Sequence, residues 1–268
     1  MSNQYDVLGK APGPEDLQKL SPDNNHLTIK KLSAGYGKME ILHDFNLNVS
    51  KAQSLCLIGP NGAGKTTTLR MMATILKPTG GTIKINGYDV VQEGVKVRSS
   101  IGFLTGSTGL YQRLTPNELT KYFADLYGVK KDVYERRKNE LYSLLGMHDF
   151  AKKRIGQLST GMRQKVSIAR TMIHDPDVVI FDEPTSGLDV ITAENIVNLI
   201  RNCKDDGKTV IFSSHIMSEV DLLCDDLAII HKGDLIYSST MEEFREQMKS
   251  KNLTEEFIRI VNNTSVVT

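Results

Sequence analysis

Residues 55–66 read LCLIGPNGAGKT, and this stretch decides how the rest of the chain is interpreted. An apolar run leads into a loop that matches the pattern G-x-x-x-x-G-K-[ST]. Residues 66–76, TTTLRMMATIL, continue with helical spacing. Strand, glycine-rich loop and helix therefore follow one another in the order that a phosphate-binding loop requires. The alternative is a glycine-rich turn that binds nothing.

The residue types of this loop suit a phosphate chain. Glycines let the backbone turn its N–H groups inward and come close to the ligand. Lys65 would bring a positive charge to the β- and γ-phosphates, and the positive end of the helix that begins near Gly64 adds to the field. The Thr66 hydroxyl would coordinate Mg²⁺. We expect nucleotide contacts from Gly59, Pro60, Asn61, Gly62, Ala63, Gly64, Lys65, Thr66 and Thr67.

Two further strands end in polar side chains that complete a hydrolytic site. Residues 178–183, VVIFDE, place Asp182 and Glu183 at the carboxyl edge of the sheet, beside the phosphate loop. We expect Asp182 to hold Mg²⁺ and Glu183 to polarise the water that attacks the γ-phosphate. Residues 209–215, TVIFSSH, bring His215 to the same edge, where it could hold the attacking geometry. A solvated acidic turn and a structural histidine are the alternatives.

Short β-branched runs punctuated by turn residues predict the fold class. Several are continuously apolar, which is typical of strands covered on both faces by other elements. We therefore predict an α/β fold with a P-loop NTPase core, a mostly parallel sheet flanked by helices. The predicted strands are LTIKKL (27–32), SLCLIG (54–59), GTIKI (81–85), IGFL (101–104), VVIF (178–181), TVIF (209–212) and LAIIH (227–231).

Spacing along the chain predicts three units. Residues 1–25 read as a flexible extension, and residues 26–240 as the main folded unit. Within the latter, apolar residues three and four apart predict a helical insert at about residues 107–173. Residues 241–268 read as a tail of two short helices.

Composition limits the function classes. The 268 residues carry 33 Lys+Arg against 32 Asp+Glu, a net charge of +1, which argues against the broad basic surface that duplex nucleic acid requires. No apolar run approaches the roughly 20 residues that cross a bilayer, and the N-terminus lacks a secretory signal, so we expect a cytoplasmic chain. Three separated cysteines lack metal-ligand spacing and predict buried structural thiols.

A fourth segment indicates a family. Residues 158–165, LSTGMRQK, open a helical pattern and would offer free N–H groups to an anion, although alone they would read as a helix cap. The order of the phosphate loop, LSTGMRQ, VVIFDEP, SGLD and SSH resembles the nucleotide-binding cassette of ABC-type ATPases over about residues 27–240. The resemblance implies ATP hydrolysis with Mg²⁺, and a small antiparallel β region beside the core.

The resemblance also implies how two chains cooperate. Tyr36 would stack on adenine; otherwise it would be an exposed loop tyrosine. Ser159 and Gly161 would contact the γ-phosphate of ATP held by a second copy, so that two cassettes close head to tail around two nucleotides. Asp189, the last residue of SGLD, would lie at that dimer interface and link the two sites. Hydrolysis would then reopen the pair.

Three positions depart from the family pattern. Members usually carry a glutamine after the strand at 101–104, where it ligates Mg²⁺ and relays closure to the membrane partner, whereas this chain has Gly106. The ligand would then be Ser107, Thr105, a water molecule or nothing. Thr160 and Met162 replace a common glycine and a common glutamine, and we expect the phosphate contact of LSTGMRQ to survive both changes.

One loop points to a narrower group. Residues 103–115, FLTGSTGLYQRLT, resemble the ATP-binding subunits of sodium-extruding ABC exporters of the Nat type. This implies a separate membrane-spanning permease on the inner face of the cell membrane, with sodium as one cargo, although no residue here could select an ion. The alternatives are an ABC ATPase acting on ribosomes or DNA, and a P-loop kinase or GTPase, which would leave LSTGMRQ unexplained.

Overall fold

The computed structural model describes residues 25–36, 39–105 and 109–265, and two sheets organise them. The larger is six-stranded with the order β10-β9-β3-β8-β7-β6, in which only β10 runs antiparallel to its neighbour. This arrangement confirms the predicted mostly parallel sheet. Its strands are β3 (Ser54–Ile58), β6 (Ile101–Thr105), β7 (Val178–Asp182), β8 (Thr209–Ser213), β9 (Asp226–His231) and β10 (Asp234–Thr240).

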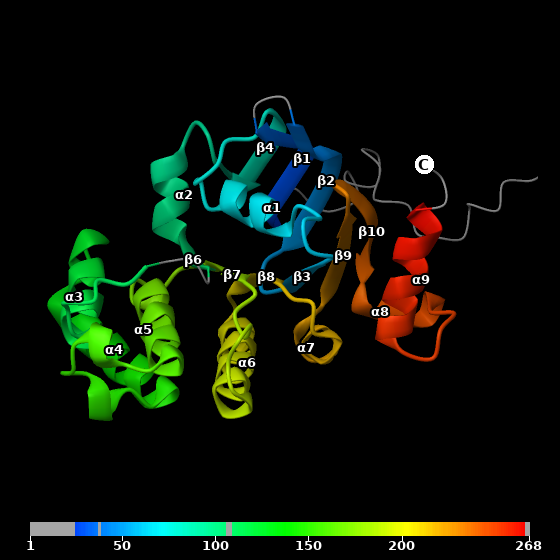
Figure 1. Ribbon diagram of the computed structural model, residues 1–268. Coiled ribbons are helices and arrows are strands. Elements are labelled where there is room, and N and C mark those ends of the chain that lie inside the picture. The colour runs from blue at the N-terminus through cyan, green and yellow to red at the C-terminus, as the bar shows by residue number, and fades with distance from the viewer. Residues whose placement is uncertain (1–24, 37–38, 106–108, 266–268) are drawn as a thin grey trace, which may run out of the picture.

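The neighbouring inner strands β3, β8 and β7 are buried at every position, which explains their continuous apolar runs. Alternate residues face opposite sides: Cys56 and Ile58 join a core with the helices below the sheet, whereas Leu55 and Leu57 join a core with the elements above it. In Figure 1, α5, α6 and α7 lie on one side of the central strands and α1 on the other. The bounds of three of them are α1 (Lys65–Met72), α6 (Val190–Asp205) and α7 (Met217–Leu223).

The second sheet is four-stranded and antiparallel, with the order β2-β1-β4-β5, and it lies on the α1 side (Figure 1). Its strands are β1 (Asn25–Tyr36), β2 (Met39–Ser50), β4 (Gly80–Ile85) and β5 (Tyr88–Asp89). The sequence prediction missed β2, β5 and β10. In β2, polar residues alternate with the buried Phe45, Leu47 and Val49, so that only one face is apolar and the segment resembles a loop.

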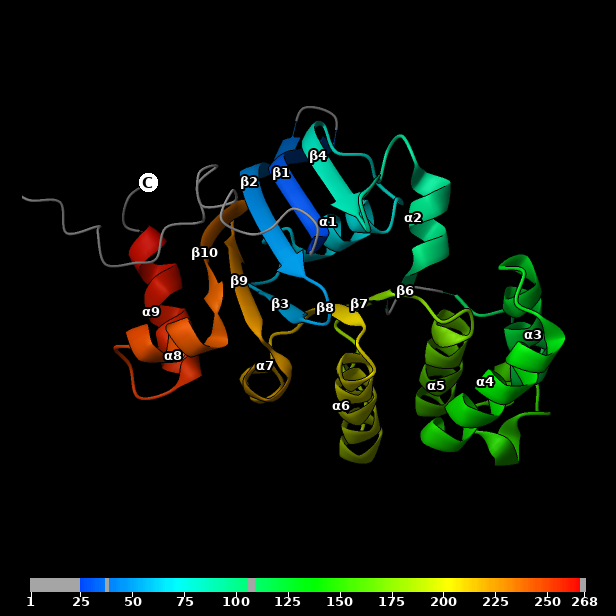
Figure 2. The same cartoon turned by 180° about the vertical axis from the view of Figure 1, so that it is seen from behind.

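A helical region forms one end of the molecule (Figure 2). Thr115 and Glu118 form a capping box at the start of α3 and fix where that helix begins. The helix α5 contacts α3 and α4 on one side and β6 on the other. α3, α4 and α5 fall within the insert predicted at about residues 107–173, whereas α2 precedes it, and the division into units stays a prediction. The elements are α2 (Gly94–Ser100), α3 (Pro116–Leu126), α4 (Lys131–Leu145), two 3₁₀ turns (His148–Phe150 and Ile155–Gln157) and α5 (Thr160–Met172).

The opposite end carries two helices after β10, α8 (Met241–Gln247) and α9 (Leu253–Ser265), as Figure 2 shows. A second capping box, Thr240 with Glu243, starts α8, and α9 contacts α7. Of the flexible extension expected at residues 1–25, residues 1–24 lie outside the described residues, and Asn25 begins β1. In the part of the chain that the structure describes, no helix combines the length and apolarity of a membrane span.

Candidate functional site

The phosphate loop (residues 59–66) joins β3 to α1, and its glycines are required by geometry. Gly64 has a φ of 113°, a left-handed conformation, and a Cβ there would lie 2.5 Å from Cδ2 of Leu42. A Cβ on Gly59 would lie 2.1 Å from the carbonyl oxygen of Ile230. The first turn of α1 has no side-chain cap, so its N–H groups remain available to an anion.

Lys65 is a buried cation within this loop, with a side chain that is 6% exposed. Its Nζ donates hydrogen bonds to the carbonyl oxygens of Gly59 at 2.7 Å and Pro60 at 3.2 Å. Burial lowers the pKa of Lys65, and the nearby carboxylates of Glu183 and Asp182 act in the opposite direction. A phosphate in the loop would favour the charged ammonium more strongly than these carbonyls do.

A hollow lies in front of the loop. Residues 61–67 line it, together with Ile41 and Glu183. Backbone N–H groups, the Lys65 region and a carboxylate therefore converge on one space. This is the arrangement that a phosphate chain and an attacking water need.

Asp182 ends β7 and meets α1 across the site. The hydroxyl of Thr66 donates to Oδ1 of Asp182 at 3.0 Å, and the hydroxyl of Ser213 donates to the same oxygen at 2.9 Å. Both hydroxyls donate to the same carboxylate oxygen, so neither of them occupies Oδ2. A hydroxyl beside a carboxylate is a hard oxygen set, which fits Mg²⁺. The two residues predicted as metal ligands are therefore brought together.

Glu183 follows Asp182 in a strained backbone conformation. Its φ of 48° is left-handed, which is uncommon for a residue with a side chain. Its N–H donates to Oγ of Ser213 at 3.0 Å, and Nδ1 of His215 lies 3.6 Å from its Oε2. Strained residues of this kind persist only where their surroundings hold them, and they concentrate at functional sites.

The signature segment (residues 158–165) stands apart from the hollow. Ser159 and Thr160 are exposed at the start of α5, and Oγ of Ser159 accepts a hydrogen bond from the N–H of Met162 at 3.2 Å. Among the described residues, those that line the phosphate-loop hollow include none of this segment. Within one chain, Ser159 and Gly161 therefore do not join the site that they were predicted to complete in a second copy.

Asp189 has a role inside the chain as the N-cap of α6. Its two carboxylate oxygens accept from the N–H of Thr192 at 2.9 Å and the Thr192 hydroxyl at 2.8 Å. These hydrogen bonds lower the pKa of the Asp189 carboxyl. A Cβ on Gly161 would lie 3.2 Å from the Thr192 hydroxyl, so α5 and α6 begin side by side.

Two predictions fall wholly or partly outside the described residues. Tyr36 ends β1 and its backbone pairs with Met39, but its predicted stacking on adenine stays a prediction. Gly106 and Ser107 lie outside the described residues. Thr105, the other residue considered for the missing glutamine, pairs in register with Asp182 at the end of β6.

Sequence reasoning gave no role to two residues that hold the turn at residues 182–184. Ser213 pairs in register with Asp182, and a hydroxyl at the end of a strand next to VVIFD could have signalled this. The Nε2 of Gln164, on α5, donates to the carbonyl oxygen of Pro184 at 3.1 Å. Its distance of 20 residues along the chain left no local pattern to detect.

Comparisons with known proteins agree with this geometry. The family described as ABC transporter matches residues 42–186. The ABC transporter ATP-binding protein NatA of Bacillus subtilis (strain 168) is 42% identical over 221 residues, covering 82% of this chain and 90% of NatA. A solved ATP-binding subunit of an ABC transporter shares 30% identity with a TM-score of 0.82, covering 87% of this chain and 98% of that one. A dimeric ATP-binding cassette in a post-hydrolysis state, bound to ADP and Pi, shares 26% identity with a TM-score of 0.73, covering 80% and 98%.

Proposed function

The chain belongs to the ABC transporter ATP-binding family, and we propose that it powers export through a separate membrane-spanning chain at the inner face of the cell membrane. Family membership makes it an ATP-binding protein and an ATPase. The observation that carries the hydrolytic part of the proposal is the junction of the phosphate loop with β7, where Thr66 contacts Asp182 and lines the same hollow as Glu183.

The residues of this junction divide the hydrolytic work. Lys65 and the N–H groups of the loop bind the β- and γ-phosphates and offset charge as the bond between them breaks. Glu183 accepts a proton from the water that attacks the γ-phosphorus, and His215 orients that carboxylate and the γ-phosphate. Thr66 and Asp182 would hold Mg²⁺, which neutralises phosphate charge when bound.

A second copy of the chain completes the site in this proposal. The exposed signature segment offers N–H groups and the Ser159 hydroxyl to a phosphate that its own chain does not hold. The similar cassette solved as a dimer supports the same association for this chain. ATP then joins two copies head to tail, and hydrolysis separates them.

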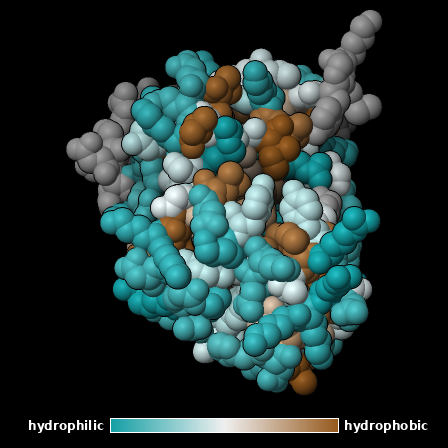
Figure 3. Space-filling view, turned by 90° about the vertical axis from the view of Figure 1, so that its left-hand side faces the viewer, coloured by the Kyte–Doolittle hydropathy of each residue, from teal (hydrophilic) through white to brown (hydrophobic). Residues whose placement is uncertain are grey.

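The α2–α3 face, defined by Ile75, Val95, Tyr111, Tyr122 and Leu126, suits a membrane partner. Val95 is 73% exposed and Leu126 is 65% exposed. In Figure 3, which looks at this side of the molecule, apolar patches interrupt a hydrophilic surface. A groove on the same face is lined by Ile75, Phe103, Phe123, Tyr127 and residues of α5. Clustered exposed apolar side chains of this kind mark interaction sites.

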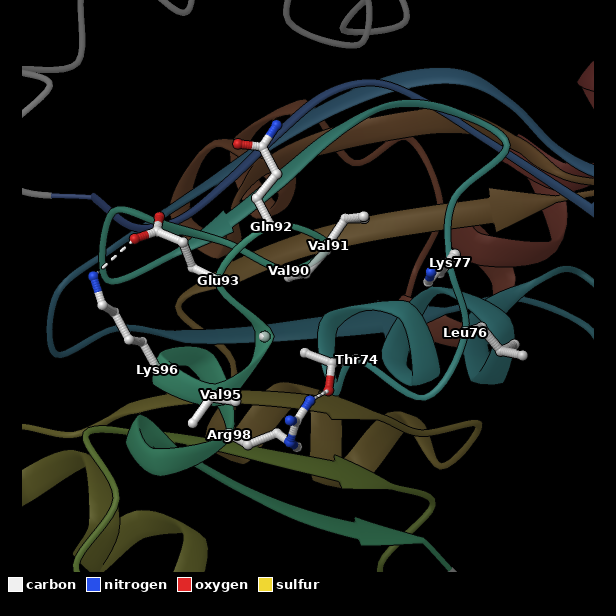
Figure 4. A pocket seen from close by; sticks show the side chains of 11 residues that line it. Thr74, Leu76, Lys77, Val90, Val91, Gln92, Glu93, Val95, Lys96 and Arg98 are labelled. Carbon is white, nitrogen blue, oxygen red and sulfur yellow. Dashed lines mark hydrogen bonds and ion pairs between the residues drawn. The ribbon is translucent and has the colours of Figure 1, made fainter.

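A neighbouring hollow between α2 and the connection after α1 extends this face (Figure 4). In it, Lys96 pairs with Glu93 at 3.0 Å, Arg98 donates to the Thr74 hydroxyl at 2.9 Å, and Lys77 also lines the space. Val95, which lines it, belongs to the α2–α3 face, and Arg98 lines both this hollow and the groove.

Sodium is the cargo that we propose. The support is the 42% identity to NatA together with the resemblance of residues 103–115 to sodium-extruding exporters. Inside-out membrane vesicles that contain the chain and its permease should accumulate sodium when ATP is added. Vesicles that hydrolyse ATP without moving sodium would remove this cargo and leave the ATPase assignment intact.

Affinity purification tests the partner. A tagged Glu183→Gln chain with MgATP, purified from gently solubilised cells, should bring a multispanning membrane protein that mass spectrometry can identify. Ribosomal or nucleic-acid proteins without a membrane partner would instead favour the alternative ATPase that acts on ribosomes or DNA.

Two exposed leucines give a matched control for the docking face. Leu126→Glu should lose the membrane partner and keep ATP binding, because a charge then faces the apolar surface of the permease. Leu222, 54% exposed on α7, lies away from that face, and Leu222→Glu should retain the partner. Equal loss in both variants would argue against docking at α2–α3.

A further inference from the structure

Gln164 makes a contact that links two functional segments of the chain. Its Nε2 donates to the carbonyl oxygen of Pro184 at 3.1 Å, directly after Glu183. A carbonyl oxygen only accepts hydrogen bonds, so the nitrogen end of the Gln164 amide must face it. The bond therefore ties the second turn of α5 to the turn that carries the hydrolytic carboxylate.

Hydrogen bonds from different elements hold the turn that begins at Glu183. The left-handed φ of Glu183 must be held by its surroundings, since that conformation is costly for a residue with a Cβ. The Ser213 hydroxyl holds its N–H from the sheet side at 3.0 Å, and the N–H of Ser186 donates to its carbonyl oxygen at 3.2 Å. Gln164 holds the same turn from α5. A displacement of α5 would therefore be felt at Glu183.

The helix α5 is built to transmit such a displacement. It has 13 residues and spans about 20 Å. Its first residues belong to the exposed signature segment, and near its other end Arg170 and Thr171 line the groove of the α2–α3 face. The guanidinium of Arg170 lies 5.3 Å from the ring centroid of Phe123, which attaches that end to α3. Gln164 lies between the two ends.

We propose that Gln164 is a positioning residue that sets the conformation of Glu183 according to the seating of α5. In the head-to-tail dimer proposed above, on which this inference rests, the signature segment of one chain contacts the nucleotide of the other. When that contact seats α5, Gln164 holds the turn after Glu183 so that the Glu183 carboxylate of the same chain is positioned for hydrolysis. Each site hydrolyses ATP only after the other site is filled, so the hydrolysis of two nucleotides becomes cooperative.

Two substitutions separate the hydrogen bond from the shape of the side chain. Gln164→Met keeps a similar length and lacks the donor, whereas Gln164→Lys keeps a donor of similar reach. Gln164→Met should lower kcat about tenfold and bring the Hill coefficient for ATP to about one. The directly titrated Kd for ATP and the Tm should match wild type, which a merely structural loss would not allow. Gln164→Lys should recover most of both the rate and the cooperativity.

Three outcomes overturn the role of Gln164. They are wild-type turnover and cooperativity in Gln164→Met, a parallel fall of turnover, ATP affinity and Tm in that variant, and identical behaviour of the Met and Lys variants. Light scattering with MgATP separates this role from the proposed dimer, because Glu183→Gln and Gln164→Met/Glu183→Gln should both dimerise. A Glu183→Gln chain that stays monomeric overturns the head-to-tail dimer, whereas the kcat of the Met and Lys variants still decides whether Gln164 positions Glu183.

Discussion

The chain presents two helix N-termini that suit phosphate, and they are completed in different ways. At the start of α1 there is no side-chain cap, a buried lysine lies beside the free N–H groups, and the carboxylate of Glu183 lines the hollow. At the start of α5, Ser159 caps one N–H and the segment faces solvent. The start of α1 therefore has the N–H groups and the cation that bind a phosphate, whereas the start of α5 offers N–H groups and a hydroxyl without a buried cation.

This difference indicates that the phosphate contacted by α5 is bound mainly by groups of another chain. A capped, exposed helix start without a nearby buried cation binds anions weakly by itself. It becomes effective when a phosphate already held elsewhere is brought against it. The asymmetry between α1 and α5 therefore favours an arrangement in which each nucleotide is bound by one chain and sensed by another.

The largest expected effect separates binding from hydrolysis at the complete site. Glu183→Gln should lower turnover by about 10²- to 10⁴-fold because the base that accepts the proton of water is lost. The ATP Kd should remain within about threefold of wild type, since Lys65 and the loop are unchanged. Steady-state phosphate release and a direct ATP titration measure the two quantities. Near-normal hydrolysis would remove Glu183 as the base.

The next largest effect is expected when the buried lysine beside α1, which has no counterpart at α5, is removed. Lys65→Ala should weaken ATP binding about 10- to 100-fold, because charge-assisted contacts to the phosphates disappear. Calorimetric titration measures it, and Lys84→Ala, an exposed lysine on β4, serves as the control that keeps wild-type affinity. An unchanged Kd in Lys65→Ala would overturn the assignment of the phosphate loop.

A smaller effect is expected at the incomplete site. Ser159→Asp and Ser159→Asn both keep a capping oxygen for α5, but the aspartate adds a negative charge where the other chain's phosphate would lie. Ser159→Asp should weaken MgATP-dependent dimerisation at least about tenfold relative to Ser159→Asn, in chains that also carry Glu183→Gln. Both should bind ATP with equal affinity. Equal dimerisation would mean that this helix start does not meet a phosphate.

The smallest effect concerns pH at the far end of α5, where His174 follows the helix. Its ring stacks on Tyr127 with centroids 3.8 Å apart, and Nε2 donates to the carbonyl oxygen of Ile101 at 3.0 Å. Burial lowers the pKa of His174 to about 4, so between about pH 6.5 and 4 the unfolded chain binds a proton that the folded chain does not. Folding stability is therefore lost as pH falls through this window.

The pH effect is best read as a difference between two chains. Burial raises the pKa of Asp226 to about 6, and this carboxyl gives the opposite slope in wild type and variant alike. From pH 7 to pH 5, the stability of wild type relative to His174→Phe should fall by about 1–2 kcal/mol. Urea unfolding at the two pH values measures it. A difference that does not change with pH would show that His174 titrates normally.

Much of the fold could be predicted because its signals are local. The run into the phosphate loop, the apolar strands before Asp182 and Ser214, and the helical spacing of α3 to α5 each specify an element within a few residues. Buried parallel strands carry continuous apolar runs, which is the strongest short-range strand signal. The strand β2 was missed because its apolar residues alternate with Asn, Asp and His on a half-exposed sheet.

The site was predictable in its residue types but not in its supports. Lys65, Thr66 and Asp182 belong to motifs whose spacing carries the chemistry. The contacts of Ser213 with Asp182 and of Gln164 with Pro184 depend on which strands and helices become neighbours. A single hydroxyl or amide has no periodicity, and only tertiary packing gives it a partner.

The hydrogen bond between Thr66 and Asp182 has a consequence for how the chain acquires its function. It joins residues 116 positions apart, and the bond from Ser213 to Asp182 spans a further 31. A ribosome releases the loop long before β7 exists, and closing so long a segment is entropically costly. MgATP therefore recognises only chains whose central sheet has closed. At 100 times its Kd, the nucleotide would raise the free energy of unfolding by about 2.7 kcal/mol. The substrate of the folded protein therefore also stabilises its folded state.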